Sequence, residues 1–228
     1  MADGGDQVLG LVLAAGRAAR MGRAKQLADL AGRPLLEHVL AAISAAPVDH
    51  LVVVLGAYAD RVLATVDLHR ARPLVVPEWD HGMGRVLALA LAEVRQGQGG
   101  ADAPGDWGAV VVALGDQPLV SAAAVARVVD AWRGGAGPVV SAAYRGRHGH
   151  PKLFDRVVLG ELRQLSGDAG ARGLLARHPG WVVPVEVGEL GSDLDVDDEP
   201  ALARARAVLA ARGESTARDR AGTRRPDG

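Results

Sequence analysis

The stretch Val8–Lys25, VLGLVLAAGRAARMGRAK, joins a short apolar run to a loop that is rich in glycine and positive charge. The apolar run has the length of a strand and no charged residue, so it predicts a strand buried inside a sheet. Gly16 and Gly22 allow the backbone that follows to turn and to approach a ligand closely. Four cations lie within nine residues of this loop: Arg17, Arg20, Arg23 and Lys25.

Backbone N–H groups that converge beside several cations suit the phosphates of a nucleoside triphosphate. The loop matches neither of the standard phosphate-binding patterns, GxxxxGK[ST] and GxGxxG. The alternative interpretation is a basic loop that is simply exposed to solvent. The connection from this strand to the next helix is unusually long, which is typical of a functional loop.

The composition excludes several classes of protein and of site. The chain has no cysteine, which excludes disulfides, thiolate zinc sites, cysteine-held iron–sulfur clusters and a cysteine nucleophile. Lys and Arg (26) nearly balance Asp and Glu (27), which argues against a surface that coats nucleic acid. The first residues lack the pattern of a signal peptide, and the longest apolar runs are too short to cross a membrane. We therefore expect a cytoplasmic protein with no nucleic-acid or membrane partner.

Short apolar runs alternate with segments of helical length, the pattern of a parallel sheet covered by helices. The predicted strands are Val8–Leu13, Leu51–Leu55, Leu74–Val76, Ala109–Leu114, Val139–Ala142 and Trp181–Val187. The predicted helices begin at Pro34 and then cover Tyr58–Val66, Met83–Val94, Ala122–Trp132, Ala169–Arg177 and Glu199–Ala211. This order predicts an α/β fold, a Rossmann-like three-layer α/β/α domain with a mostly parallel sheet, over residues 1–212. Residues 213–228 contain no strongly apolar side chain, and we expect a disordered tail there.

A second candidate motif, ALGDQP at residues 113–118, directly follows the most apolar predicted strand. Ligands of open α/β sheets bind beyond the carboxyl ends of the strands, where Asp116 is expected. A carboxylate at such a place suits Mg²⁺, which takes one or two protein carboxylates and otherwise binds phosphate oxygens. An Asp that only caps a turn or a helix is the alternative.

A third motif, GSDLDVDDEP at residues 191–200, is strongly acidic. In an extended segment Asp193, Asp195 and Asp197 would share one face. We take Asp195 as the second metal carboxylate, although the spacing alone does not separate it from Asp193 or Asp197. Acidic residues are also favoured at the start of a helix, and this explains Asp197, Asp198 and Glu199 equally well.

Two weaker motifs are GHPKLF at residues 149–154 and GDAGAR at residues 167–172. Each combines glycine with polar side chains and is interpreted either as part of an acceptor pocket or as a plain turn and helix cap. His150, Asp168 and Arg172 are the candidate acceptor-side residues. His148 and His150 have no third ligand nearby in the sequence, so a zinc site is not expected.

In this order and spacing, LAAGRAARMGRAK, GDQPLV, GHPKLF, GDAGAR and DLDVDDEPAL resemble the motifs of the MobA-like nucleotidyltransferases. The resemblance covers about residues 7–212 and is strongest to the molybdenum cofactor cytidylyltransferases. It implies a nucleotide-diphospho-sugar-transferase-like fold and transfer of a nucleotidyl group with release of pyrophosphate. It also implies dependence on Mg²⁺, with Mn²⁺ as an alternative.

The resemblance also assigns roles to individual residues. The triphosphate and nucleotide side is implied for Leu13, Ala14, Ala15, Gly16, Arg20, Gly22, Lys25, Gly82, Met83 and Asp116. Catalytic roles are implied for Arg20, Lys25 and Asp116, and metal binding for Asp116 and Asp195. Ala15 stands where guanylyl-transferring members have glycine, and its methyl group favours CTP by about 1–3 kcal/mol at most.

The stretch Val76–Leu87 departs from the pattern NPxWxxGMSxSL of similar sequences. Val76 replaces the Asn, and Gly84 and Val86 replace the two Ser, so polar groups that help to frame the nucleotide are missing. Two alternatives to CMP transfer onto phosphorylated molybdopterin therefore stay open. One is an NAD(P)H-dependent oxidoreductase of the nicotine blue type on the same fold. The other is a non-catalytic, nucleotide-binding chaperone of a molybdenum hydroxylase.

Overall fold

The computed structural model describes residues 6–17, 21–96 and 107–222, with residues 213–222 described by their backbone alone. Seven strands form the main sheet, in the order β5-β4-β1-β6-β8-β7-β9. These strands are β1 (Val8–Ala14), β4 (His50–Leu55), β5 (Arg72–Val75), β6 (Ala109–Leu114), β7 (Val139–Tyr144), β8 (Arg147–Asp155) and β9 (Val182–Glu186). All neighbouring pairs are parallel except the two that involve β8, which runs antiparallel to β6 and β7. The predicted α/β fold with a mostly parallel sheet is confirmed.

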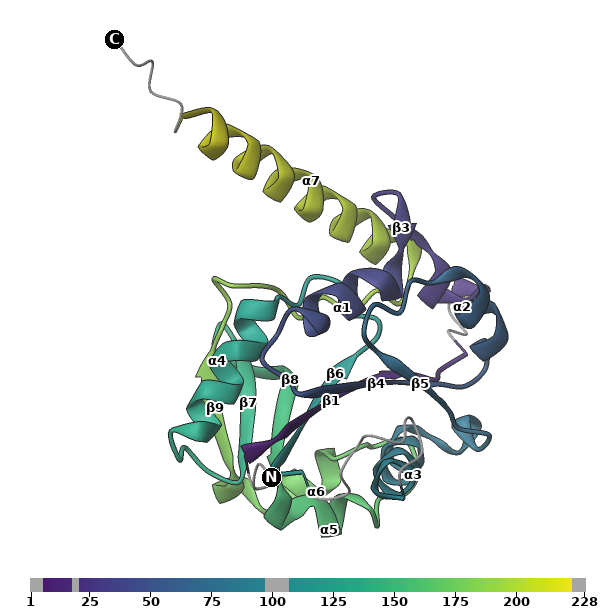
Figure 1. Ribbon diagram of the computed structural model, residues 1–228, viewed down its shortest axis with the longest axis vertical. Coiled ribbons are helices and arrows are strands. Elements are labelled where there is room, and N and C mark those ends of the chain that lie inside the picture. The colour runs from purple at the N-terminus through teal and green to yellow at the C-terminus, as the bar shows by residue number, and fades with distance from the viewer. Residues whose placement is uncertain (1–5, 18–20, 97–106, 223–228) are drawn as a thin grey trace.

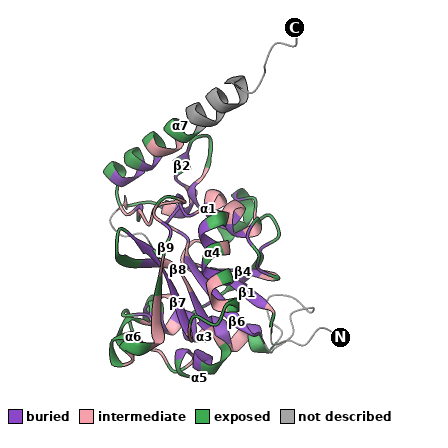
Figure 2. Cartoon of the chain, turned by 90° about the vertical axis from the view of Figure 1, so that its left-hand side faces the viewer, coloured by how far each residue is buried: buried purple, intermediate pink, exposed green. Residues whose placement is uncertain are grey.

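Helices cover both faces of this sheet (Figure 1). One face packs against α1 (Leu35–Ser44), α2 (Ala59–Thr65) and α4 (Ala122–Arg133). The other face packs against α3 (Met83–Arg95), α5 (Leu159–Leu162) and α6 (Arg172–Arg177). The central strands are buried on both sides, whereas the outer surfaces of the helices are exposed (Figure 2). This is why β1, β4 and β6 are continuous apolar runs rather than alternating ones.

A small third cluster lies at one end of the molecule. A two-stranded hairpin of β2 (Asp29–Leu30) and β3 (Arg33–Pro34) packs there with the start of α7 (Glu199–Gly222). Beyond this contact α7 projects away from the body (Figure 1). No helix among the described residues is long and apolar enough to cross a membrane.

Two expectations from the sequence need correction. β8, the longest described strand, was not predicted, because its sequence, RHGHPKLFD, has a proline and two histidines in place of an apolar run. The helix predicted over Ala169–Arg177 is shorter and begins at Arg172. The backbone of α7 is helical to Gly222. The end of the domain at residue 212 and the disordered tail beyond it stay predictions. Residues 223–228 lie outside the described part of the chain.

Candidate functional site

The first candidate site lies where β1 and β6 end side by side. These strands are parallel, with Leu13 opposite Leu114, so the loops that follow them leave the sheet at the same edge. They enclose a pocket of about 330 Å³. Its lining includes residues of both loops, of the start of α3 and of the 166–168 turn: Leu13, Ala14, Ala15, Gly16, Arg17, Lys25, Gln26, Trp79, Asp80, Gly82, Met83, Val86, Leu114, Gly115, Asp116 and Asp168.

Lys25 joins three segments that are far apart in the sequence. Its ammonium donates to Asp116 Oδ2 at 2.6 Å and to Asp197 Oδ1 at 2.8 Å. Burial alone would lower the pKa of Lys25, but the negative charges and hydrogen bonds of the two carboxylates outweigh burial and raise it. Lys25 is therefore a fixed cation at the mouth of the pocket.

The second carboxylate oxygen of Asp116 has a different environment. Asp116 Oδ1 is buried and has no hydrogen-bond partner among the described residues. An unpartnered buried carboxylate oxygen is costly unless a ligand, a water or an ion satisfies it. An unpartnered oxygen on a residue that lines the pocket is compatible with a metal ligand.

Asp195 lies close to Asp116 in the fold. Its Oδ1 accepts a hydrogen bond of 2.8 Å from Gln117 Nε2. Burial raises the pKa of Asp195; the Gln117 bond opposes this, and the charges of Asp116 and Asp197 raise the pKa further. A divalent cation would relieve this repulsion. Among the described residues, no group of three or more His, Asp or Glu side chains could hold a metal ion.

The acidic motif divides into residues with distinct contacts. Asp197, two residues before α7, pairs with Lys25. Asp198 does cap α7, because its Oδ1 accepts from the N–H of Ala201 at 2.7 Å. Glu199, in the first turn of α7, forms an ion pair with Arg23. The acidic segment thus connects Arg23 and Lys25, in the loop after β1, to the start of α7.

Gln26 holds the loop after β1 in place, and this role of Gln26 was not predicted from the sequence. The side chain is buried, and its Nε2 donates to the carbonyls of Ala14 and Gly16, both at 2.9 Å. Nothing in the local sequence around Gln26 indicates these contacts with carbonyls 10 and 12 positions away. Gly22 adopts a left-handed backbone with φ of 62°, as a glycine turn requires. Arg20 lies outside the described residues.

The start of α3 forms another wall of the first pocket. Gly82 and Met83 line it as expected, together with Trp79, over whose ring the Arg17 guanidinium lies at 5.3 Å from the centroid. Gly84 donates its N–H to the Gly167 carbonyl at 2.7 Å. A Cβ on Gly84 would lie 2.8 Å from the Ser166 carbonyl oxygen, so the missing serine has no room here.

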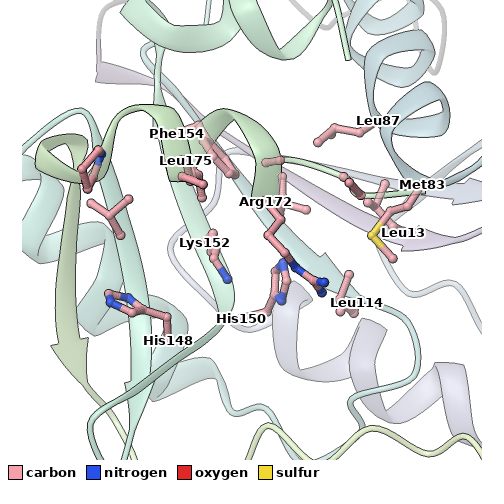
Figure 3. A pocket seen from close by; sticks show the side chains of 17 residues that line it. Leu13, Met83, Leu87, Leu114, His148, His150, Lys152, Phe154, Arg172 and Leu175 are labelled. Carbon is pink, nitrogen blue, oxygen red and sulfur yellow. The ribbon is translucent and has the colours of Figure 1, made fainter. Parts of the chain in front are cut away.

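A second pocket of about 490 Å³ adjoins the first and shares Leu13, Met83 and Leu114 with it. Alternate residues of β8 line it, because successive side chains of a strand point to opposite faces. Figure 3 shows Lys152, His150 and Arg172 pointing toward one another in a wall that is otherwise mainly apolar and also includes His148. His150 and Arg172 line this second pocket, whereas Asp168 lines the first, and the acceptor-side role of all three stays a prediction. Lys152 was not singled out from the sequence.

Comparisons with known proteins agree with this architecture. Residues 10–181 match the model of the MobA-like NTP transferase domain. A protein of Paenarthrobacter nicotinovorans named nicotine blue oxidoreductase is 33% identical over 199 residues, which cover 83% of this chain and 92% of the relative.

Two solved structures extend the comparison. Rv0371c of Mycobacterium tuberculosis H37Rv in complex with manganese is 32% identical, covers 88% of this chain and 98% of its own, and has a TM-score of 0.70. A CMP-2-keto-3-deoxy-manno-octonic acid synthetase in complex with CTP shares the fold alone, with 17% identity, coverage of 90% and 99%, and a TM-score of 0.70. On its match to the domain model, the chain belongs to the MobA-like NTP transferase family, a family of nucleotidyltransferases.

Proposed function

We propose that this protein transfers CMP from CTP to a small phosphorylated acceptor and releases pyrophosphate. The observation that supports this proposal best is the environment of Asp116, which lines the first pocket. One of its carboxylate oxygens accepts from Lys25, and the other is buried without a described partner. Molybdopterin is the acceptor that the resemblance to the cytidylyltransferases implies. No covalent enzyme intermediate is needed, which suits a site with no cysteine.

In this proposal the first pocket holds CTP and the adjoining pocket holds the acceptor. An oxygen of the acceptor phosphate forms a bond to the α-phosphorus, and the bond from that phosphorus to the oxygen of the β-phosphate breaks. The pair of electrons leaves with pyrophosphate. Lys25 places a positive charge beside the phosphates, where negative charge develops. Asp116 and Asp195 would hold Mg²⁺ or Mn²⁺, which when bound neutralises phosphate charge.

The preference for CTP rests on the shape of the loop. Ala15 is buried and lines the first pocket, so its methyl group narrows the space that a base can occupy. A single methyl group discriminates by about 1–3 kcal/mol, which is enough to favour the smaller pyrimidine. The acceptor side is supported by Lys152 and Arg172, two cations that suit a phosphate.

The test compares wild type with Asp116→Asn in pyrophosphate release from CTP, Mg²⁺ and acceptor, and in CTP binding by calorimetry. The substitution removes a charged ligand and keeps the shape, so we expect release to fall about 10²-fold or more and CTP binding to lose its Mg²⁺ dependence. Asp130→Asn, an exposed change on α4, is the matched control. Full activity in Asp116→Asn with an unchanged thermal midpoint would refute the metal assignment.

A second candidate is an NAD(P)H-dependent oxidoreductase. It is favoured by the likeness to a protein named nicotine blue oxidoreductase and by the apolar residues Val76, Gly84 and Val86 in place of polar ones. The same calorimetry with NADPH separates the two functions. Tight NADPH binding that needs no metal, together with no Mg²⁺-dependent binding of CTP, would replace the first proposal by the second.

A further inference from the structure

The second pocket has the chemistry of a site for one anionic group on an apolar body. Its walls are mainly aliphatic and aromatic: Leu13, Met83, Leu87, Val112, Leu114, Phe154, Leu175, Pro179 and Val182. Lys152, Arg172, His148 and His150 are its only lining residues with ionisable side chains among those described, and none of them is acidic.

Lys152 is one of very few lysines in this chain, and it lines a pocket. The sequence has only two lysines, Lys25 and Lys152, and arginine supplies the other basic side chains. Lys25 lines the first pocket and Lys152 the second. The Nζ of Lys152 donates to the Gly149 carbonyl at 2.7 Å, which leaves two of its three N–H donors for other acceptors. A compact ammonium is thus placed inside an apolar cavity.

We propose that Lys152 and Arg172 together select an acceptor whose body is apolar and which carries a single anionic group. The role of this ligand as an acceptor rests on the proposed function. The binding preference itself does not depend on nucleotidyl transfer. It differs from the molybdopterin expectation, because a pterin has a polar edge that would need several hydrogen-bonding partners. The described lining offers few such partners.

The electrostatics make the preference sensitive to pH. Burial lowers the pKa of Lys152 to about 8; the positive charge of Arg172 lowers it too, and Asp193 opposes the shift. His150 contributes no charge, because burial lowers its pKa to about 3, with a smaller effect of Lys152. His148 on the same strand completes the ionisable groups that line this pocket. Lys152 is therefore charged at pH 7 and neutral at pH 9.5.

The test uses three fluorescent probes on the full chain. One is 8-anilinonaphthalene-1-sulfonate, an apolar aromatic body with one anionic group; the second is N-phenyl-1-naphthylamine, the same body without the charge. The third is pterin-6-carboxylate, an anion with a polar edge. We expect the sulfonate to bind at least about tenfold more tightly than the neutral amine at pH 7, and this ratio to fall several-fold by pH 9.5.

Variants of Lys152 test whether this residue causes the preference for the anionic probe. Lys152→Met should lose about tenfold in the ratio of sulfonate to amine affinity at pH 7, and Lys152→Arg should keep the ratio and lose its pH dependence. Arg177→Met, which removes an exposed charge of α6 outside the pocket, is the matched control. A wild-type ratio near one, or a ratio unchanged in Lys152→Met, overturns the proposal. Tighter binding of pterin-6-carboxylate than of the sulfonate overturns its apolar part.

Failure of the transfer proposal gives a different result. CTP binding with Mg²⁺ is measured on the same Lys152→Met sample and is expected to match wild type, because Lys152 does not line the first pocket. Absence of CTP binding in both proteins would refute nucleotidyl transfer and leave the probe preference intact. If Lys152→Met fails to fold, the pH titration of the wild-type ratio decides alone, and a flat profile counts against the proposal.

Discussion

His150 is a histidine that the fold keeps neutral. Burial, with a smaller contribution from Lys152, lowers its pKa from 6.5 to about 3. Below pH 6.5 the unfolded chain binds a proton at this residue that the folded chain does not, so stability must fall as the pH falls. We expect a loss of roughly 2 kcal/mol at pH 5 relative to neutral pH from this group. Urea unfolding of wild type and His150→Gln at pH 5 and pH 7.5 measures it.

His148→Gln is the control, because it removes an exposed imidazole two residues away on the same strand. The difference between the two pH values should shrink in His150→Gln and persist in His148→Gln. Equal acid losses in wild type and His150→Gln would show that this imidazole is not held neutral.

Single residues of the site were predictable where a charged side chain stands next to a local motif in the sequence. Lys25 and Asp116 were expected from their charge beside a glycine loop and a strand end, and the structure brings their side chains to 2.6 Å. The Lys25–Asp197 pair was not expected, because it joins residues 172 positions apart and depends on how the last segment folds back. Gln26 and Lys152 act through tertiary contacts that have no local signature.

At the scale of elements, the junction of α3 with the 166–168 turn shapes the first pocket. A Cβ on Gly84 would meet the carbonyl oxygens of Ser166 at 2.8 Å and of Gly167 at 2.9 Å. We expect Gly84→Ser to displace this turn, to destabilise the protein by about 1–3 kcal/mol and to weaken CTP binding, since Asp168 on the turn lines the pocket. Urea unfolding and calorimetry provide the measurements.

Gly160→Ala in α5 is the matched control, because a Cβ there meets no atom within 4 Å. It should stabilise slightly, as alanine favours a helix over glycine. A Gly84→Ser protein as stable as wild type would mean that the turn yields without cost.

Elements with strong local patterns were predicted and those without were not. The apolar runs of β1, β4 and β6 are long enough to identify by eye, and the helices on both faces follow from their apolar spacing. β8 carries its apolar residues among histidine, proline and lysine because one of its faces lines a pocket rather than a core. A strand face that lines a pocket thus lacks the apolar pattern by which the strand could have been predicted.

For the whole molecule, the domain was predicted to end at residue 212, and this boundary stays a prediction. The described apolar contacts of α7 involve Leu202, Ala205, Val208 and Leu209, all before that point. A chain shortened after Arg212 is therefore expected to unfold cooperatively, with a midpoint within about 2 °C of the full chain and the same CTP affinity. Calorimetric melting and CTP titration test this; a drop of 10 °C or more would place part of the fold beyond residue 212.

The arrangement of the sheet explains what sequence order could not supply. The placement of β8 between β6 and β7 is a non-local pairing, and it brings Lys152 and His150 beside the end of β1. Neither the strand order nor the junction of the two pockets follows from local periodicity, which reports only which face of an element is apolar.

The scarcity of lysine has a practical consequence for chemical labelling. Since Lys25 and Lys152 are the only lysines and each lines a different pocket, acylation of lysine side chains reads out both pockets and no other part of the surface. The free-base amine is the reactive form, so Lys152, with a pKa of about 8, should react first, while two carboxylates hold Lys25 protonated. Two modified peptides in a digest would then report separately whether a ligand occupies the first or the second pocket.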